Sequence, residues 1–272
     1  MNDQRCAPCA KDFEVLVLAS PFDEGVVNNN GRPGAKGGPQ SIKNRLEKLY
    51  AHDHLKKYGW VEIDKAPPHP LSQNIPLSKK LKLLHLGGGH DTIVQALEIL
   101  NNSSLYKKNS SLMVNFDPHP DVRDPSVYGW TSGGGFFQLR KNFPIFSKYL
   151  LIGAQEQNIS KNHIDLVDEI LWFQDIPRTK RVPFVINHLK KALLKHKHFF
   201  LSFDLDCIQD FVGVSAPCGY GFEYADILEI IDSFKNHPKL MGMGVYELSP
   251  SLDLTPLSVI KAANLVYRLL IP

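Results

Sequence analysis

The stretch LMVNFDPHPD, residues 112–121, joins a continuous apolar run to three side chains able to bind metal. An apolar run without alternation is typical of a strand covered on both faces in a parallel α/β sheet. Asp117, His119 and Asp121 follow at once, and open parallel sheets bind ligands at the carboxyl ends of their strands. Pro118 and Pro120 disfavour a helix. We therefore expect an extended segment whose alternation brings these three side chains to one side.

Five further apolar runs predict strands of the same sheet, at residues 13–18, 81–86, 149–152, 198–203 and 240–245. Amphipathic segments predict covering helices near residues 40–55, 92–100 and 225–234. We expect a three-layer α/β/α sandwich with a mostly parallel central sheet. Turn-forming residues 28–39 predict a long loop after the first strand. Because no repeat or linker divides the chain, we expect one domain over residues 1–272, with residues 1–10 as a flexible N-terminus.

Composition narrows the class of partner. A formal net charge of +3 is too small for a nucleic-acid footprint, and no apolar run approaches the roughly 20 residues of a membrane span. We expect a soluble, cytoplasmic protein with a small-molecule partner, no nucleic acid and no membrane contact. The pair Cys6 and Cys9 lacks a second ligand pair, so we interpret it as incidental. Cys207 and Cys218 lie in apolar stretches and are expected to be buried, reduced thiols.

Two more polar clusters follow predicted strands. The glycine turn before His90 follows the run 81–86, and Asp204 and Asp206 end the run 198–203. We expect the two aspartates on one side of an extended segment. Taken alone, a glycine turn is usually only a turn, a lone histidine is usually a core residue, and a pair of aspartates usually lies in a solvated loop. Their coincidence at three strand ends favours one shared site.

The combined residue set fits two divalent cations. It comprises Asp117, Asp121, Asp204 and Asp206 with His90 and His119. Four negative charges this close would repel one another without cations. Carboxylate and imidazole ligands without thiolate favour manganese, with iron, cobalt or zinc as open alternatives. Two such ions can share a water, lower its pKa and direct hydroxide at an electrophilic carbon, which is hydrolytic chemistry.

These motifs resemble those of the ureohydrolase superfamily, which includes arginases, agmatinases and formimidoylglutamases. Gly-Gly-x-His, Asp-x-His-x-Asp and Ser-x-Asp-x-Asp occur in order, and the likeness continues to ELSPSLD at residues 247–253. The resemblance implies an arginase-like fold with two Mn²⁺ per chain. It implies one ion held by His90 and Asp121, another held by His119 and Asp206, and both bridged by Asp117 and Asp204.

Within the superfamily the chain looks most like formimidoylglutamase, through DEGV at 23–26, GRPGA at 31–35, NFD at 115–117 and SAP at 215–217. This implies hydrolysis of N-formimidoyl-L-glutamate to L-glutamate and formamide. Glu247 would hold the cationic amidine, and Asp206 would be the proton donor. The further substrate contacts implied are Arg32, Asn115, Ser132 and Gly133. Arg32 or Lys36 would pair with substrate carboxylates, although a loop that solvates its own charges explains both equally well.

Some positions depart from the family pattern. Gly135 stands where proline is usual and Phe137 where arginine is usual, which leaves the substrate open, and Pro118 replaces a common alanine. No histidine lies between Asp121 and Gln138, where arginases place a proton shuttle, and this argues against arginase proper. One alternative is a guanidinohydrolase that releases urea. The other is a non-catalytic relative, but the complete set of metal ligands argues against it. The resemblance also implies that this chain forms a homo-oligomer.

Overall fold

The computed structural model describes residues 13–49, 55–71, 75–78, 80–137 and 139–271. Within them, eight parallel strands form one sheet in the order β2-β1-β3-β8-β7-β4-β5-β6. The strands are β1 (Val15–Ser20), β2 (Tyr58–Glu62), β3 (Lys82–Gly87), β4 (Ser111–Phe116), β5 (Phe146–Ala154), β6 (Glu169–Trp172), β7 (His198–Asp204) and β8 (Leu240–Tyr246). All six strands that the apolar runs predict are present, so this part of the prediction is confirmed.

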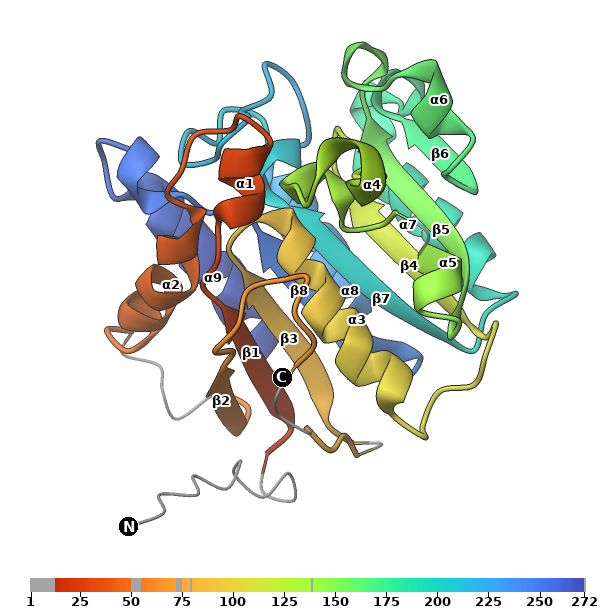
Figure 1. Cartoon of the computed structure of the whole chain (residues 1–272), viewed down its shortest axis with the longest axis horizontal. Helices are drawn as coiled ribbons and strands as arrows, with labels where there is room; N and C mark the ends of the chain where they lie inside the picture. Colours follow the sequence, from red (N-terminus) through yellow and green to blue (C-terminus); the bar gives the residue numbers. More distant parts are fainter. Residues whose placement is uncertain (1–12, 50–54, 72–74, 79, 138, 272) are drawn as a thin grey trace.

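Helices cover both faces of the sheet (Figure 1). Their bounds are α1 (Glu24–Asn28), α2 (Gly38–Leu46), α3 (Ile93–Asn102), α4 (Pro125–Tyr128), α5 (Leu139–Asn142), α6 (Lys161–Ile164), α7 (Arg181–Leu193), α8 (Tyr224–Phe234) and α9 (Leu257–Leu270). Buried side chains of α2, α7, α8 and α9 pack in one hydrophobic cluster, and those of α3 and α5 pack in the other. The predicted α/β/α sandwich is therefore confirmed, and the sheet is parallel throughout.

Two strands and several boundaries differ from the sequence prediction. The apolar runs missed β2 and β6, which are the two edge strands and are only partly buried, so their sequences lack a long apolar run. Helix α2 already begins at Gly38 and ends at Leu46, so both the predicted loop and the predicted helix were too long. Cys207 is buried and free, but Cys218 is free and only half-buried. Cys6, Cys9 and the expected flexible N-terminus lie outside the described residues.

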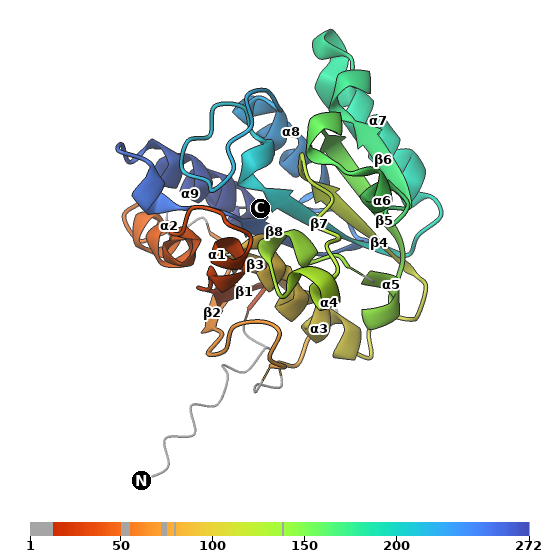
Figure 2. The same cartoon turned by 45° about the horizontal axis from the view of Figure 1, so that its top comes forward.

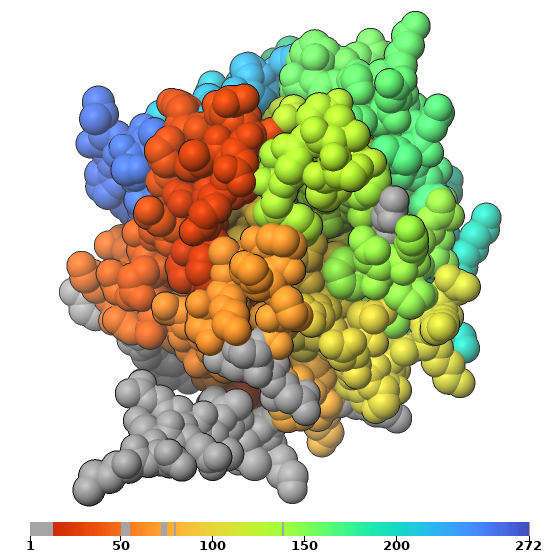
Figure 3. All heavy atoms as spheres, in the orientation of Figure 1, coloured from red at the N-terminus to blue at the C-terminus, as the bar shows by residue number. Residues whose placement is uncertain are grey.

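The carboxyl ends of the strands meet at one edge of the sheet, which Figure 2 turns forward. Helix α1 and the segment that follows α4 lie beside each other over this edge, where the Asn28 amide donates a hydrogen bond to the carbonyl of Trp130 at 2.9 Å. In the space-filling view the red atoms of the α1 segment touch the yellow-green atoms around α4 (Figure 3). No helix among the described residues is long and apolar enough to cross a membrane.

Candidate metal centre

Four neighbouring central strands, β3, β8, β7 and β4, each deliver a polar side chain to the same edge of the sheet. His90 lies in the turn after β3, Glu247 directly follows β8, Asp204 ends β7, and Asp117 directly follows β4. All four are buried, with exposed fractions between 0% and 6%. Because parallel strands end together, residues up to 157 positions apart in sequence become neighbours.

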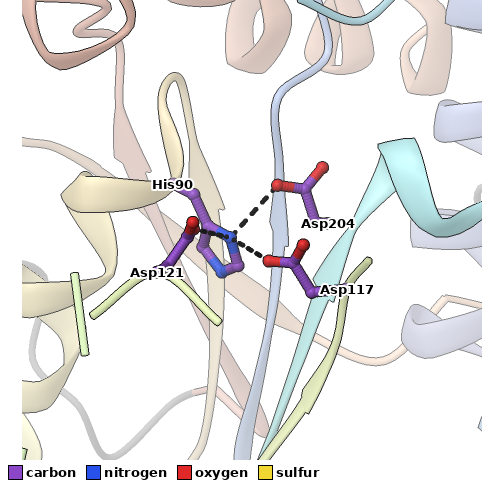
Figure 4. A group of neighbouring side chains, drawn as sticks. All are labelled: His90, Asp117, Asp121 and Asp204. Carbon is purple, nitrogen blue, oxygen red and sulfur yellow. Dashed lines mark ion pairs between the residues drawn. The ribbon is translucent and has the colours of Figure 1, made fainter. Parts of the chain in front are cut away.

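Three carboxylates converge on one nitrogen of His90 (Figure 4). Its Nδ1 lies 3.0 Å from Asp117 Oδ2, 3.0 Å from Asp121 Oδ2 and 3.1 Å from Asp204 Oδ2. Its other nitrogen, Nε2, lies 2.8 Å from the hydroxyl oxygen of Ser202. A hydrogen bond donated from Nε2 to Ser202 leaves the lone pair of Nδ1 facing the carboxylates, as in histidines that bind a metal.

The charges of this group fit a metal ion. Burial lowers the pKa of His90, but hydrogen bonds to Asp117, Asp121 and Asp204 raise it well above its ordinary value. A single proton on Nδ1 could bond well to only one of three acceptors, whereas a divalent ion can be shared by the nitrogen and all three oxygens. The donor set contains carboxylate and imidazole but no thiolate, which suits manganese.

A second group adjoins the first. His119 Nδ1 lies 3.2 Å from Asp206 Oδ2 and 3.3 Å from Asp117 Oδ1. Asp117 therefore belongs to both groups, with one oxygen in each, as its expected bridging position requires. Asp204 lies in the first group only, so its bridging position stays a prediction. The His119 side chain is 30% exposed, which places the second group nearer to solvent than the first.

The local backbone differs from the predicted extended segments. Asp121 has φ 49°, in the left-handed region, and the chain turns after Asp117, whose Oδ1 accepts the backbone N–H of His119 at 2.7 Å. Asp206 lies in a 3₁₀ turn, where its N–H donates to Asp204 Oδ1 at 2.9 Å. The prediction of two extended segments was wrong because aspartate side chains bind the backbone two residues further on and so favour tight turns.

Asn115, expected to contact substrate, lies instead behind the metal ligands. Its side chain is completely buried, and its Nδ2 lies 3.1 Å from Asp117 Oδ2 and 3.2 Å from the Tyr149 hydroxyl. That hydroxyl donates to the carbonyl of Pro120 at 2.8 Å. Asn115 does not line the cavity above the metal groups. The Asn115 amide thus contacts Asp117 and Tyr149 from inside β4, and its expected contact with substrate stays a prediction.

A cavity of about 470 Å³ opens above both groups. Of the predicted residues, Arg32, Ser132, Gly133 and Glu247 line it together with His119, Asp121, Asp204 and Asp206. Lys36 does not line it, because its side chain is 69% exposed and lies 4.0 Å from Asp23. The pairing of Lys36 with a substrate carboxylate therefore has no support from the cavity lining and stays a prediction.

Two further side chains that can carry a positive charge line the cavity, and neither was predicted from the sequence. Arg123 lies on the wall, where its Nη1 donates to Asn29 Oδ1. The Asn29 amide in turn donates to the hydroxyl of Ser132 at 3.2 Å. His163 comes from α6, and burial and the nearby Arg123 lower its pKa. Arg123 could have been found because it follows the predicted ligand Asp121 by two residues, whereas no sequence signal marks His163.

Glu247 presents one unpaired oxygen to this site. Its backbone has φ 68°, and its Oε1 accepts the backbone N–H of His90 at 2.8 Å. Its Oε2 is buried without a hydrogen-bond partner among the described residues. Burial raises the pKa of Glu247 well above its ordinary value, and the charge of Asp204 raises it further. A cationic group in the cavity would satisfy both the unpaired oxygen and the buried charge.

The two departures from the family pattern lie at the edge of the centre. A Cβ added to Gly135 would come within 2.9 Å of Ile93 Cγ2 and 3.2 Å of the His90 carbonyl oxygen. Glycine at this position therefore lets the 131–137 segment pack directly on the turn that carries His90. Phe137 is half-buried and does not line the cavity.

Comparison with known proteins places this centre in a family. Residues 13–271 match the model of the arginase family. A formimidoylglutamase of Streptococcus gordonii is 27% identical over 299 residues, which cover 99% of this chain and 87% of that protein.

Solved structures share the fold. The crystal structure of Trypanosoma cruzi formiminoglutamase with Mn²⁺ has a TM-score of 0.79 and 23% identity, and the match covers 97% of this chain and 95% of that one. Proclavaminate amidino hydrolase of Streptomyces clavuligerus has a TM-score of 0.76 and 20% identity, over 95% and 90% of the two chains. The fold is thus common to proteins with different names and does not select a substrate. Because the family model matches nearly the whole length, the chain belongs to the arginase family.

Proposed function

We propose that this chain hydrolyses the amidine C–N bond of N-formimidoyl-L-glutamate, using two Mn²⁺, and releases L-glutamate and formamide. Its formimidoylglutamase relatives support this proposal, and so does the distribution of charge around the cavity. The substrate carries a cationic amidine, one carboxylate on the carbon next to the amidine nitrogen and a second carboxylate at the far end of its side chain. A site for it needs an acid near the metals and cations further out.

The charges of the cavity match this pattern, and this observation carries the proposal. Among the described lining residues, every carboxylate belongs to a metal group or is Glu247. Apart from His119, which belongs to the second metal group, the remaining ionisable residues among the described lining are Arg32, Arg123 and His163. Agmatine carries a distal ammonium group, and arginine carries an ammonium group beside its carboxylate. Neither ammonium group would find a further acidic partner among the described lining residues. Two arginines instead suit the two carboxylates of a glutamate tail.

The local contacts hold these cations in place. Arg32 is exposed, and its Nε and Nη2 donate to the carbonyls of Ser215 at 3.1 Å and Val214 at 2.8 Å. The backbone N–H of Arg123 donates to the carbonyl of Gly133 at 2.8 Å while its side chain bonds Asn29. Both guanidinium groups are therefore oriented before substrate binds, which reduces the entropy cost of binding.

The proposed roles follow from these positions. One ion would be held by His90 and Asp121 and the other by His119 and Asp206, with Asp117 shared between the two groups. Asp204 lies in the first group and would contribute to both ions, as the family resemblance implies. Bound there, the metal pair supplies Lewis acidity and lowers the pKa of water.

Glu247 Oε2 accepts from the amidinium and orients its carbon over the metal groups. Asp206 is the proton donor to the leaving nitrogen, because it lines the cavity and its Oδ1 has no partner among the described residues.

A product assay tests the proposal. Manganese-loaded protein is given formimidoylglutamate, arginine and agmatine, and the release of formamide, urea and ammonia is measured. We expect formamide from formimidoylglutamate and little urea from the others. Arg123→Gln should raise KM for formimidoylglutamate about tenfold or more, whereas Arg178→Gln, outside the cavity, should not. Faster urea release from agmatine would overturn the proposed substrate in favour of a guanidinohydrolase.

We also propose that the protein works in the cytoplasm as a homo-oligomer. The free thiols of Cys207 and Cys218 support a reducing compartment, and the family resemblance supports the oligomer. Light scattering coupled to size-exclusion chromatography measures the mass in solution, and a monomer mass would contradict the second part.

A further inference from the structure

A buried aromatic side chain covers one face of the metal-binding imidazole. Tyr246 ends β8, and its ring stacks on the ring of His90 with centroids 4.5 Å apart and an angle of 23° between planes. Phe136 meets the same imidazole edge to face, at 5.3 Å and 89°. Together with the Ser202 hydrogen bond at Nε2, these two ring contacts hold the imidazole whose Nδ1 faces the carboxylates.

Tyr246 is itself fixed by a buried hydrogen-bonded chain. Its hydroxyl lies 2.9 Å from His85 Nδ1, and His85 Nε2 lies 2.8 Å from the hydroxyl oxygen of Ser20. The side chains of all three residues are completely buried. A neutral imidazole offers one donor and one acceptor, so His85 can satisfy both hydroxyl groups at once. The position of the Tyr246 ring is therefore set by strands β1, β3 and β8 together.

Two glycines provide the space for this ring. A Cβ added to Gly87 would lie 2.4 Å from Tyr246 Cδ1, and one added to Gly244 would lie 2.0 Å from the Tyr246 hydroxyl oxygen. Gly244 precedes Tyr246 by two residues on the same strand, so both belong to the same face of the sheet. The ring consequently lies against the backbone of β3 and β8, directly beneath the turn that carries His90.

We propose that Tyr246 is a positioning residue for the first metal group, rather than only a core side chain. A hydrogen bond at Nε2 holds one atom of an imidazole but lets the ring rotate about that bond, and histidine χ2 has a broad energy well. The stacked ring removes this rotation and keeps Nδ1 directed to the point where Asp117, Asp121 and Asp204 converge.

The second group has no such support. His119 is 30% exposed and makes no aromatic contact among the described residues. Tyr246 therefore governs one of the two metal positions and not the other. This inference rests on the proposed ligand sets, in which His90 and His119 serve different ions.

Manganese titration of variants tests this asymmetry. Tyr246→Leu and Tyr246→Met remove the planar ring, and the methionine fills much of its volume. Tyr246→Phe keeps the stack and removes only the hydroxyl. Phe199→Leu is the matched control, because Phe199 is equally buried but lies at the other end of β7 from Asp204. Free Mn²⁺ is followed by electron paramagnetic resonance, and circular dichroism verifies folding.

We expect wild type and Phe199→Leu to bind two ions with the same affinities. The leucine and methionine variants should weaken one of the two sites by about 10- to 100-fold and leave the other within about twofold, while Tyr246→Phe stays near wild type. If folded leucine or methionine variants keep both affinities, or weaken both sites equally, the positioning role is overturned. A wild-type protein that binds fewer than two ions would instead overturn the proposed metal centre. The methionine variant serves as the test where the leucine variant does not fold.

Discussion

The variant Glu247→Gln tests whether binding of the substrate's amidinium group can be separated from assembly of the two metal groups. Glu247 belongs to neither group of possible metal ligands, and its Oε1 accepts from the His90 backbone at 2.8 Å. Glutamine keeps the shape, and its amide oxygen can still accept that hydrogen bond. The amide nitrogen then takes the place of Oε2, which has no partner among the described residues. The variant should keep its fold and both metals while presenting a donor to a cationic substrate.

The size of the effect follows from the loss of one charged hydrogen bond in a buried site. Such a bond contributes about 1.5–3 kcal/mol, and each ~1.4 kcal/mol changes a rate about tenfold. The bond alone accounts for a loss of roughly one to two orders of magnitude. Leaving the amidinium unpaired in a buried cavity adds to this cost. We therefore expect kcat/KM to fall by about two orders of magnitude or more.

The assay measures formamide release and the manganese content of the same samples. Asp204→Asn should lose metal as well as activity, because Asp204 Oδ2 lies 3.1 Å from His90 Nδ1 in the first group. Glu229→Gln, an exchange of the same kind on α8, should change neither. Near-native turnover by Glu247→Gln, or loss of its metals, would refute the reasoning.

Three further predictions concern the metals, their support and the C-terminal helix. Elemental analysis after manganese loading should give two ions per chain. A content far below two ions, with activity that survives exhaustive chelation, would contradict the dinuclear centre. Asn115→Ala should weaken manganese binding about tenfold or more, because Asp117 loses a buried donor; an unchanged titration would argue against that role. Hydrogen bonds from Ser258 and Thr255 hold the pKa of Asp253 below its ordinary value. The ionised Asp253 carboxylate therefore stabilises the folded state fully at pH values above its unfolded pKa of about 4. This stabilisation is lost as the pH falls through the lower pKa that Asp253 has in the folded state. Asp253→Ala should lower Tm at pH 7, and its difference from wild type should shrink in acid; a constant difference between pH 7 and pH 2 would exclude this linkage.

The sequence by itself determined the central architecture and indicated which residues are candidate metal ligands. Strands such as β4, β7 and β8 are mostly apolar without alternation, and this pattern of burial on both faces is visible in the local sequence. His90, Asp117 and Asp204 stand at strand ends, and this position also follows from local sequence. The edge strands β2 and β6 carry a weaker pattern because solvent replaces part of their packing.

Only the tertiary structure decided how these residues face one another. Local sequence suggested extended segments, yet Asp121 adopts a left-handed conformation in the folded chain. Partners distant in sequence set the final orientations: Ser202, 112 residues away, fixes His90, and Ser215, 183 residues away, holds Arg32. Arg123 became a site residue only once the cavity was defined. Short-range geometry selects which side chains stand at a strand end, but their direction depends on packing and hydrogen bonds that exist only after the sheet has brought remote strands together.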